Sequence, residues 1–175
     1  MTDAELRTYV RNIPDFPKPG ILFKDITPLL ASGRAFQEVV DRIADRYRGS
    51  VDMVLGIESR GFIIGAAVAY RLGLGLALVR KPGKLPHQTY AARYELEYGT
   101  DTLEIHRDAF GNKSRVLIVD DLLATGGTAA AAIELVRRLD GEVTACAFIM
   151  ELAFLKGRKR LDAPEVFALI TYDGE

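Results

Sequence analysis

The stretch that decides the fold is Arg115–Ala132, RVLIVDDLLATGGTAAAA. Its apolar run, Val116–Val119, is rich in β-branched residues and lies between polar residues, which is typical of a buried parallel strand. Two carboxylates, Asp120 and Asp121, follow the run, and a turn of small residues at Ala124–Thr128 comes next. The stretch therefore predicts a strand whose end carries two acids and a glycine turn.

A helix is expected over residues 129–139, because Ile133, Val136 and Leu139 repeat at helical spacing. Gly126 and Gly127 let the backbone come close to a ligand, and the free N–H groups of a helix start favour an anion. The neighbouring acids would repel a bare anion and need hydroxyl groups or a cation. A ribose that carries a 5-phosphate satisfies both requirements. The alternative is an ordinary strand-to-helix turn that is capped by aspartate.

Two familiar phosphate-binding patterns are absent from the sequence, namely G-x-x-x-x-G-K-[ST] and a G-x-G-x-x-G after a strand. Val119–Thr128 instead resembles the phosphoribosyl-pyrophosphate (PRPP) motif of type I phosphoribosyltransferases, which reads Val-Val-Asp-Asp-x-x-x-Thr-Gly-Gly-Thr. The resemblance implies that Asp120 and Asp121 hold the 2- and 3-hydroxyls of the ribose. It also implies that the loop holds the 5-phosphate through Ala124, Thr125, Gly126, Gly127 and Thr128.

Length and composition fit one domain over residues 1–175, with 49% hydrophobic residues for a core. The 23 Lys and Arg nearly balance the 24 Asp and Glu, which argues against broad binding to nucleic acid or to anionic membranes. No apolar run approaches the roughly 20 residues of a membrane span, and the N-terminus does not resemble a signal peptide. The single cysteine, Cys146, is expected to be a buried free thiol, so we expect a cytoplasmic protein without disulfides.

The segment Phe16–Pro28 is expected to be a stiff loop, because it carries several prolines and packs apolar residues inward. Its sequence, FPKPGILFKDITP, resembles the opening segment of adenine phosphoribosyltransferases, which lies over the purine. The resemblance implies that Leu22, Phe23 and Lys24 bind adenine, with main-chain groups of Leu22 and Lys24 reading the ring edge. It also implies that Leu152 closes one side of the base pocket.

A second strand-turn-helix start is expected where the strand 53–57 meets Glu58–Gly61, before a helix over 62–72. The resemblance implies that Ser59 and Arg60 contact pyrophosphate, that Arg60 is catalytic, and that the Glu58–Ser59 peptide is cis. The alternative is that Ser59 simply caps the helix.

The basic segment Arg80–Tyr90 follows a strand predicted over 76–79 and is expected to be a loop. The resemblance implies that Arg80, Lys81 and Lys84 contact pyrophosphate on a lid, although a solvated surface loop is the alternative. His87 is expected to be a bystander.

Alternating sidedness over residues 94–98 and 103–106 predicts a two-stranded antiparallel arm, which carries few core contacts and suits a lid. The resemblance implies that Glu97 is catalytic and that Tyr98 contacts PRPP. Without it, an exposed glutamate on an edge ribbon would be the expectation.

The remaining pattern predicts helices over 4–13 and 33–48, strands over 142–150 and 166–170, and a mixed basic stretch at 151–161. The basic group in that stretch, Lys156, Arg158, Lys159 and Arg160, is expected to be a solvated face. The alternation of strands and helices predicts an α/β fold with a mostly parallel twisted sheet that is flanked by helices. A small hood and the antiparallel flexible arm complete the expected architecture, with the sites at the carboxyl ends of strands.

The resemblance to adenine phosphoribosyltransferases covers nearly the whole chain. It implies a pentosyl transfer in which adenine and PRPP give AMP and pyrophosphate, a step of purine salvage. It further implies Mg²⁺ held mainly by substrate and water, with no dedicated protein metal site, and a homodimer.

Two alternatives remain open. One is a phosphoribosyltransferase for another base, although Ala124 stands where the 6-oxopurine enzymes usually carry aspartate. The other is a PRPP-sensing regulator without catalysis, although the chain has no spare length for a DNA-binding segment.

Overall fold

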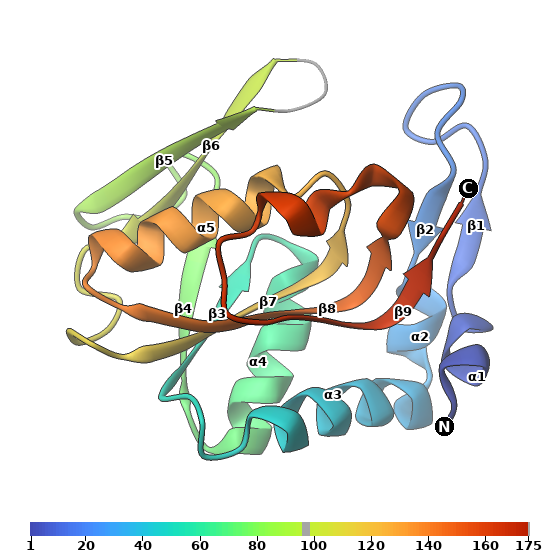
Figure 1. Cartoon of the computed structure of the whole chain (residues 1–175), viewed down its shortest axis with the longest axis horizontal. Helices are drawn as coiled ribbons and strands as arrows, with labels where there is room; N and C mark the ends of the chain where they lie inside the picture. Colours follow the sequence, from blue (N-terminus) through green and yellow to red (C-terminus); the bar gives the residue numbers. More distant parts are fainter. Residues whose placement is uncertain (96–98, 175) are drawn as a thin grey trace.

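The computed structural model describes residues 1–95 and 99–174. In that part of the chain a seven-stranded sheet has the order β5-β6-β4-β3-β7-β8-β9 (Figure 1). β3, β4, β7, β8 and β9 pair in parallel, while β6 is antiparallel to both β4 and β5. The bounds are β3 (Met53–Ile57), β4 (Gly75–Arg80), β5 (Thr89–Glu95), β6 (Thr100–His106), β7 (Arg115–Leu123), β8 (Glu142–Leu152) and β9 (Val166–Tyr172). The mostly parallel sheet and the antiparallel arm are thus confirmed.

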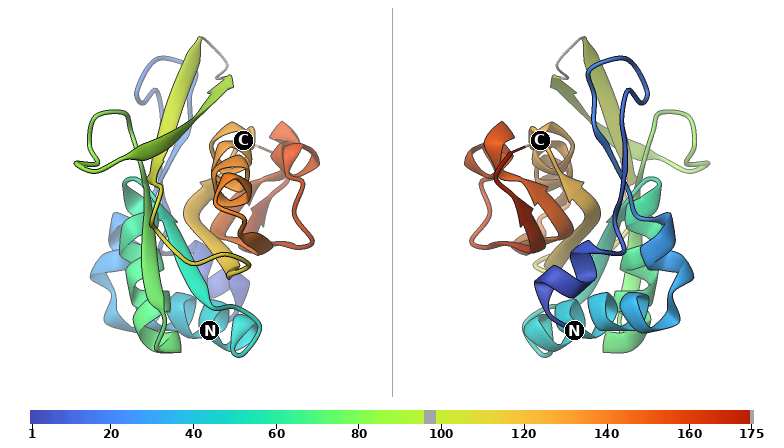
Figure 2. Two further views of the ribbon diagram at one scale, coloured as in Figure 1. Left: turned by 90° about the vertical axis from the view of Figure 1, so that its left-hand side faces the viewer. Right: turned by 90° about the vertical axis from the view of Figure 1, so that its right-hand side faces the viewer.

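Helices cover both faces of the sheet, as the side views in Figure 2 show. One face carries α3 (Gly33–Tyr47) and α4 (Arg60–Leu72), and the other carries α5 (Gly127–Arg138). Two short 3₁₀ helices, η1 (Ala153–Leu155) and η2 (Gly157–Arg160), lie near α5. The central strands are therefore buried on both sides and read as continuous apolar runs.

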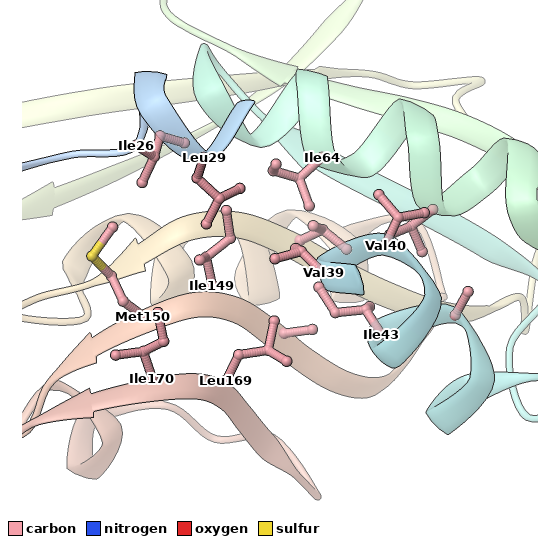
Figure 3. Close-up of a cluster of buried hydrophobic side chains, with 14 of the residues drawn as sticks. Ile26, Leu29, Val39, Val40, Ile43, Ile64, Ile149, Met150, Leu169 and Ile170 are labelled. Atoms are coloured by element: carbon pink, nitrogen blue, oxygen red, sulfur yellow. The ribbon is translucent and has the colours of Figure 1, made fainter. Parts of the chain in front are cut away.

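The core on the α3 and α4 side is formed by aliphatic side chains from the helices and the sheet (Figure 3). α3 begins at its N-cap Ser32, whose hydroxyl accepts a hydrogen bond from the backbone N–H of Ala35. It buries Val39 and Ile43, which are one helical turn apart. A second apolar cluster on the α5 side includes Ile118 of β7. Among the described residues, no helix is both long enough and apolar enough to cross a membrane.

The N-terminal segment differs from the predicted helix over 4–13. α1 (Asp3–Arg7) is short, and β1 (Arg11–Ile13) pairs antiparallel with β2 (Phe23–Asp25) in a separate small sheet. Ile13 precedes Pro14, and a residue before proline favours extended backbone over helix. The pair β1–β2 supplies the small hood, which lies beside the C-terminal strand in Figure 1.

Three other predicted boundaries were wrong. Thr27 and Pro28, at the end of the predicted loop, begin α2 (Thr27–Ala31), because Pro28 in a first helical turn needs no N–H partner. β5 begins at Thr89, inside the predicted loop 80–90. β7 runs on to Leu123, so that Asp120 and Asp121 lie within the strand rather than after it.

Register places the ends of three strands at one edge of the sheet. Gly56 of β3 lies opposite Val119 of β7, and Ile57 lies opposite Val79 of β4. The residues that follow these positions are Glu58, Asp120 and Arg80, and they meet at the carboxyl edge. Ligands of open α/β sheets bind at such an edge.

Candidate active site

The two acids of β7 have different surroundings. Asp121 is buried, and its Oδ2 accepts a hydrogen bond from Nε of Arg60 at 2.5 Å. Arg60 is the first residue of α4, so the helix start delivers a guanidinium group to the end of β7. The backbone N–H of Asp121 donates to Oδ1 of Asp120 at 2.9 Å. The predicted residues Arg60, Asp120 and Asp121 therefore lie together.

Burial of the carboxyl group, followed by the charge of Asp121, holds the pKa of Asp120 well above its usual value. Asp120 nevertheless keeps part of its surface open to the cleft. A desolvated carboxyl group in this position is stabilised by any hydroxyl donor that reaches it. The end of β7 thus suits a neutral ligand that is rich in hydroxyl groups.

α4 can approach β7 closely because its second residue is Gly61. A Cβ atom at Gly61 would lie 2.8 Å from Oδ1 of Asp120 and 2.8 Å from the carbonyl oxygen of Val119. Both distances are shorter than any ordinary Cβ contact, so only glycine fits between the helix and the strand.

The loop between β7 and α5 forms a small hollow of about 70 Å³ that is lined by residues 122–129, with Asp120 and Phe148. Gly126 is the N-cap of α5 and has a positive φ of 83°, a conformation that glycine adopts without strain. The first N–H groups of a helix have no partner within the helix, so this helix start is suited to bind an anion. Ala124, Thr125, Gly126, Gly127 and Thr128 all line this hollow.

The opposite wall of the cleft carries ion pairs from β3, β4 and the arm. Nη2 of Arg80 donates to Oε1 of Glu58 at 2.9 Å, and the backbone N–H of Lys81 donates to Oε2 at 2.8 Å. The Arg80 guanidinium, followed by the Lys81 N–H, holds the pKa of Glu58 below its usual value. Arg80 also donates to the carbonyl oxygen of Lys84 at 3.3 Å.

Lys81 points at the arm rather than at another residue of its own loop. Its ammonium group bonds to Asp101 and, at 3.1 Å, to the hydroxyl of Tyr94. Burial lowers the pKa of Lys81, but the hydrogen bonds with Asp101 and Tyr94 outweigh that effect, and the net shift is upward. Lys81 is therefore held as a cation at the edge of the cleft.

The Glu58–Ser59 peptide is cis, as the resemblance implied. Ser59 is the N-cap of α4, but its side chain makes no capping hydrogen bond. The alternative that Ser59 only caps this helix is therefore not supported. Ser59 instead lines the cleft.

These elements enclose a cleft of about 370 Å³, which opens between β7, the start of α4 and the arm. Its walls bring together predicted residues from three segments of the chain. They are Ser59, Arg60, Lys81, Asp120, Asp121, Ala124 and Thr128. Arg80 and Lys84 lie behind this wall, where Arg80 pairs with Glu58.

A separate apolar pocket of about 230 Å³ lies under the hood, lined by the predicted Leu22, Lys24 and Leu152 together with Phe154 and Leu155. Phe23 does not line this pocket. Its ring packs on Phe16 at 5.1 Å between centroids and lies 5.2 Å from the guanidinium carbon of Arg60.

Lys24 is buried, and its Nζ donates to Oδ1 of Asn12 at 3.0 Å and lies 4.4 Å above the ring of Tyr172. Burial, followed by the charge of Arg7, lowers the pKa of Lys24. The side chain of Lys24 thus fastens β2 to β1 and to the last strand.

Glu97 and Tyr98 lie outside the described residues.

The sequence did not indicate the roles that two further residues, Glu58 and Arg158, have in the structure. Glu58 organises Arg80 and Lys81, and the available signal was an acid directly after a buried strand. Arg158 is no free surface charge, because it pairs with the buried Glu151.

This chain is similar to known proteins in sequence and in structure. A family model described as "Phosphoribosyl transferase domain" matches residues 24–171. The adenine phosphoribosyltransferase of Geobacter metallireducens is 58% identical over 169 residues, which cover 96% of this chain and 99% of that protein. The adenine phosphoribosyltransferase of Chloroflexus aurantiacus is also 58% identical, over 98% of this chain and 100% of that protein.

Solved structures agree with these relatives. The crystal structure of adenine phosphoribosyltransferase from Thermoanaerobacter pseudethanolicus superposes with a TM-score of 0.94 at 52% identity, covering 98% of this chain and 100% of that chain. The Saccharomyces cerevisiae enzyme superposes with a TM-score of 0.91 at 44% identity, covering 96% of this chain and 98% of that chain. The yeast structure holds D-2,5-dideoxy-2,5-imino-altritol 1,6-bisphosphate and adenine.

Proposed function

The chain belongs to the phosphoribosyl transferase family and within it to the adenine phosphoribosyltransferases, and we propose that its cleft and hood pocket carry the reaction of that group. The chain transfers the 5-phosphoribosyl group of PRPP to adenine, giving AMP and pyrophosphate, a step of purine salvage. The observation that carries this assignment to a site is the acidic end of β7 beside the glycine turn of α5.

The cleft divides the binding of PRPP between two kinds of group. The carboxyl groups of Asp120 and Asp121 take the ribose hydroxyls, since both are desolvated and Asp120 faces the cleft. The loop Ala124–Thr128 takes the 5-phosphate through the N–H groups at the start of α5 and the threonine hydroxyls. This division places C1 of the ribose between the loop and the cationic wall.

Bond breaking at C1 develops positive charge on the ribose and negative charge on the departing pyrophosphate. Arg60 and Lys81 line the cleft and meet that negative charge, which makes Arg60 catalytic in this proposal. Ser59 adds hydrogen-bond donors at the start of α4. Tyr98, which lies outside the described residues, is proposed to contact PRPP because of the family resemblance. Arg80 and Lys84 are also proposed to contact pyrophosphate. Arg80 is paired with Glu58 in this structure, so it must leave Glu58 before it can bind pyrophosphate.

Adenine binds against the hood, where Leu22, Lys24 and Leu152 line the pocket and main-chain groups of Leu22 and Lys24 read the ring edge. Phe23, whose ring lies outside this pocket beside Arg60, would contact the side of the purine that faces the cleft. N9 of adenine forms its bond to C1 as the bond from C1 to pyrophosphate breaks. Adenine must lose one proton overall, and N7 carries that proton while the bond forms. Glu97 is proposed to share that proton, because Asp120 and Asp121 serve the ribose and Ala124 has no acid to offer.

Mg²⁺ fits the donors of this cleft, because carboxylate oxygens of Glu58, Asp120 and Asp121 line it and hard cations prefer oxygen. Within residues 1–95 and 99–174, no three histidine, cysteine or acidic side chains converge as a ready metal site. In line with the family resemblance, we propose that substrate oxygens and water supply most ligands, with these carboxylates nearby. When bound, the ion would neutralise charge on the pyrophosphate.

A homodimer and a cytoplasmic location complete the proposal. Ile63 and Tyr70 on α4 leave 45% and 90% of their surface exposed, and Leu78 on β4 is exposed as well. A second copy of the chain would cover these apolar groups. Cys146 is a buried free thiol, and a single cysteine without a disulfide is compatible with a reducing compartment. Light scattering of the Tyr70→Glu variant tests the dimer, which should become monomeric.

Product analysis tests the activity itself. The purified chain, incubated with adenine, PRPP and Mg²⁺, should form AMP and pyrophosphate in equal amounts, and omitting PRPP should abolish both. Asp120→Asn combined with Asp121→Asn should remove the activity while the fold is retained. A chain that binds PRPP but forms no AMP would support the regulator instead.

A further inference from the structure

The loop that holds the 5-phosphate is supported from behind by a segment that the reaction scheme does not use. A Cβ atom at Gly157 would lie 2.1 Å from the carbonyl oxygen of Ala124 and 2.9 Å from the backbone nitrogen of Gly126. In the reverse direction, a Cβ atom at Gly126 would lie 2.5 Å from the carbonyl oxygen of Gly157. Two glycines therefore let the backbone of η2 touch the backbone of the loop directly.

The segment around Gly157 is anchored independently of the loop. Arg158 bonds through its guanidinium to Glu151, which is 4% exposed, with Nε and Oε1 3.1 Å apart, and to the carbonyl oxygen of Val166. Glu151 belongs to β8 and is held in register between Leu123 of β7 and Thr171 of β9. A charge pair of this kind is expensive to break, because Glu151 would be left buried without a partner.

Local backbone bonds stiffen the same segment. The N–H of Lys156 donates to the carbonyl oxygen of Ala153 at 3.0 Å, and the N–H of Lys159 donates to that of Lys156 at 3.1 Å. Lys156 has a positive φ of 56°, which turns the chain between η1 and η2 and brings Gly157 against the loop. The segment is thus a fixed support. If a side chain were added at the contact, the loop would move rather than the segment.

We propose that Gly157 is a positioning residue for the PRPP reaction, which sets the place of the phosphate loop by direct backbone contact. This inference rests on the proposed function, because it assigns the 5-phosphate to Ala124–Thr128. Leu152, Phe154 and Leu155 line the hood pocket, so one short segment borders the base at one end and the phosphate loop at the other.

The Gly157→Ala variant tests the proposal. Its methyl group would be more than 1 Å too close to the Ala124 carbonyl for ordinary contact, so the loop must shift. We expect the KM for PRPP to rise roughly tenfold or more, because a misplacement of about 1 Å can cost about 10²-fold. The dissociation constant of ribose 5-phosphate, measured by calorimetry, should rise with it, while the KM for adenine changes less. Lys159→Ala, which shortens an exposed side chain two positions away, is the matched control and should leave all three constants unchanged.

The outcomes separate positioning from mere structural support. A folded Gly157→Ala variant with unchanged ribose 5-phosphate binding and an unchanged KM for PRPP would overturn the proposal, as would equal losses for PRPP and adenine. If this variant fails to fold, Arg158→Lys replaces it, because lysine keeps the charge next to Glu151 but loses the two-pronged bond. A raised KM for PRPP in Arg158→Lys then supports the proposal, and an unchanged KM refutes it. Absence of AMP formation in the unmodified chain would refute the proposed function, while ribose 5-phosphate binding would still test Gly157.

Discussion

Replacing Gly61 with alanine tests whether the start of α4 and the end of β7 are packed as tightly as the active site requires. The new Cβ atom would lie 2.8 Å from both Oδ1 of Asp120 and the carbonyl oxygen of Val119, and 3.2 Å from the Asp120 Cα. Ordinary contact begins near 3.4 Å, so the helix and the strand must separate by about half an ångström. Overpacking of this kind costs about 1–3 kcal/mol. We expect the upper part of that range, because two of the three obstructing atoms belong to the backbone of a central strand.

Two measurements follow the effect of Gly61→Ala. Urea unfolding should show a free energy of unfolding that is lower by about 1–3 kcal/mol. Because Asp120 is displaced with the strand, kcat/KM for PRPP should fall roughly tenfold or more. Gly33→Ala is the matched control, since Gly33 is exposed at the start of α3 and an added Cβ meets nothing within 4 Å. That variant should be as stable as the parent or slightly more so. A Gly61→Ala variant with the parent's stability and kinetics would refute the packing account.

Three further predictions concern proton transfer, the lid and pH. Glu97→Gln should lower kcat by tens-fold or more, up to the roughly 10²–10⁴-fold contribution of general acid–base catalysis, with PRPP binding near normal. Undiminished kcat under conditions where chemistry limits the rate would remove Glu97 from the mechanism. Hydrogen exchange over residues 81–98 should slow when PRPP and Mg²⁺ bind, and unchanged exchange would count against a lid. Hydrogen bonds from the side chain and then the backbone of Arg115 lower the pKa of Asp52 to about 2. The stability that this pair contributes is therefore present above about pH 4 and is lost as the pH falls through about 2. Asp52→Asn should flatten the acid dependence of urea midpoints in that window, whereas identical pH profiles would contradict it.

The parts of the fold that depend on local pattern were predictable from the sequence. Val116–Val119 and the repeat of Ile133, Val136 and Leu139 indicated the strand and the helix on either side of the loop Ala124–Thr128, because burial imposes apolar runs on strands and helical spacing on helices. Resemblance supplied the cis peptide before Ser59, which no composition or periodicity would indicate.

Other features depend on contacts that are distant in sequence. Arg11–Ile13 forms a strand only because Phe23–Asp25 lies beside it, so the N-terminal pattern alone favoured a helix. The role of Glu58 appears only when parallel pairing brings β4 alongside β3 and places Arg80 within reach. Gly157 looks like an ordinary loop glycine until the fold sets it against Ala124.

The measurement that tests the account most directly is a comparison of bases at saturating PRPP and Mg²⁺. The rate of nucleotide formation is followed spectrophotometrically with adenine, hypoxanthine, guanine and orotate. The structure places Ala124, which has no acid, in the cleft beside Asp120 and Thr128, and Leu22, Lys24 and Leu152 line the pocket under the hood. We predict that adenine has by far the highest kcat/KM of the four bases. A comparable kcat/KM for hypoxanthine would contradict the assignment of this site to adenine.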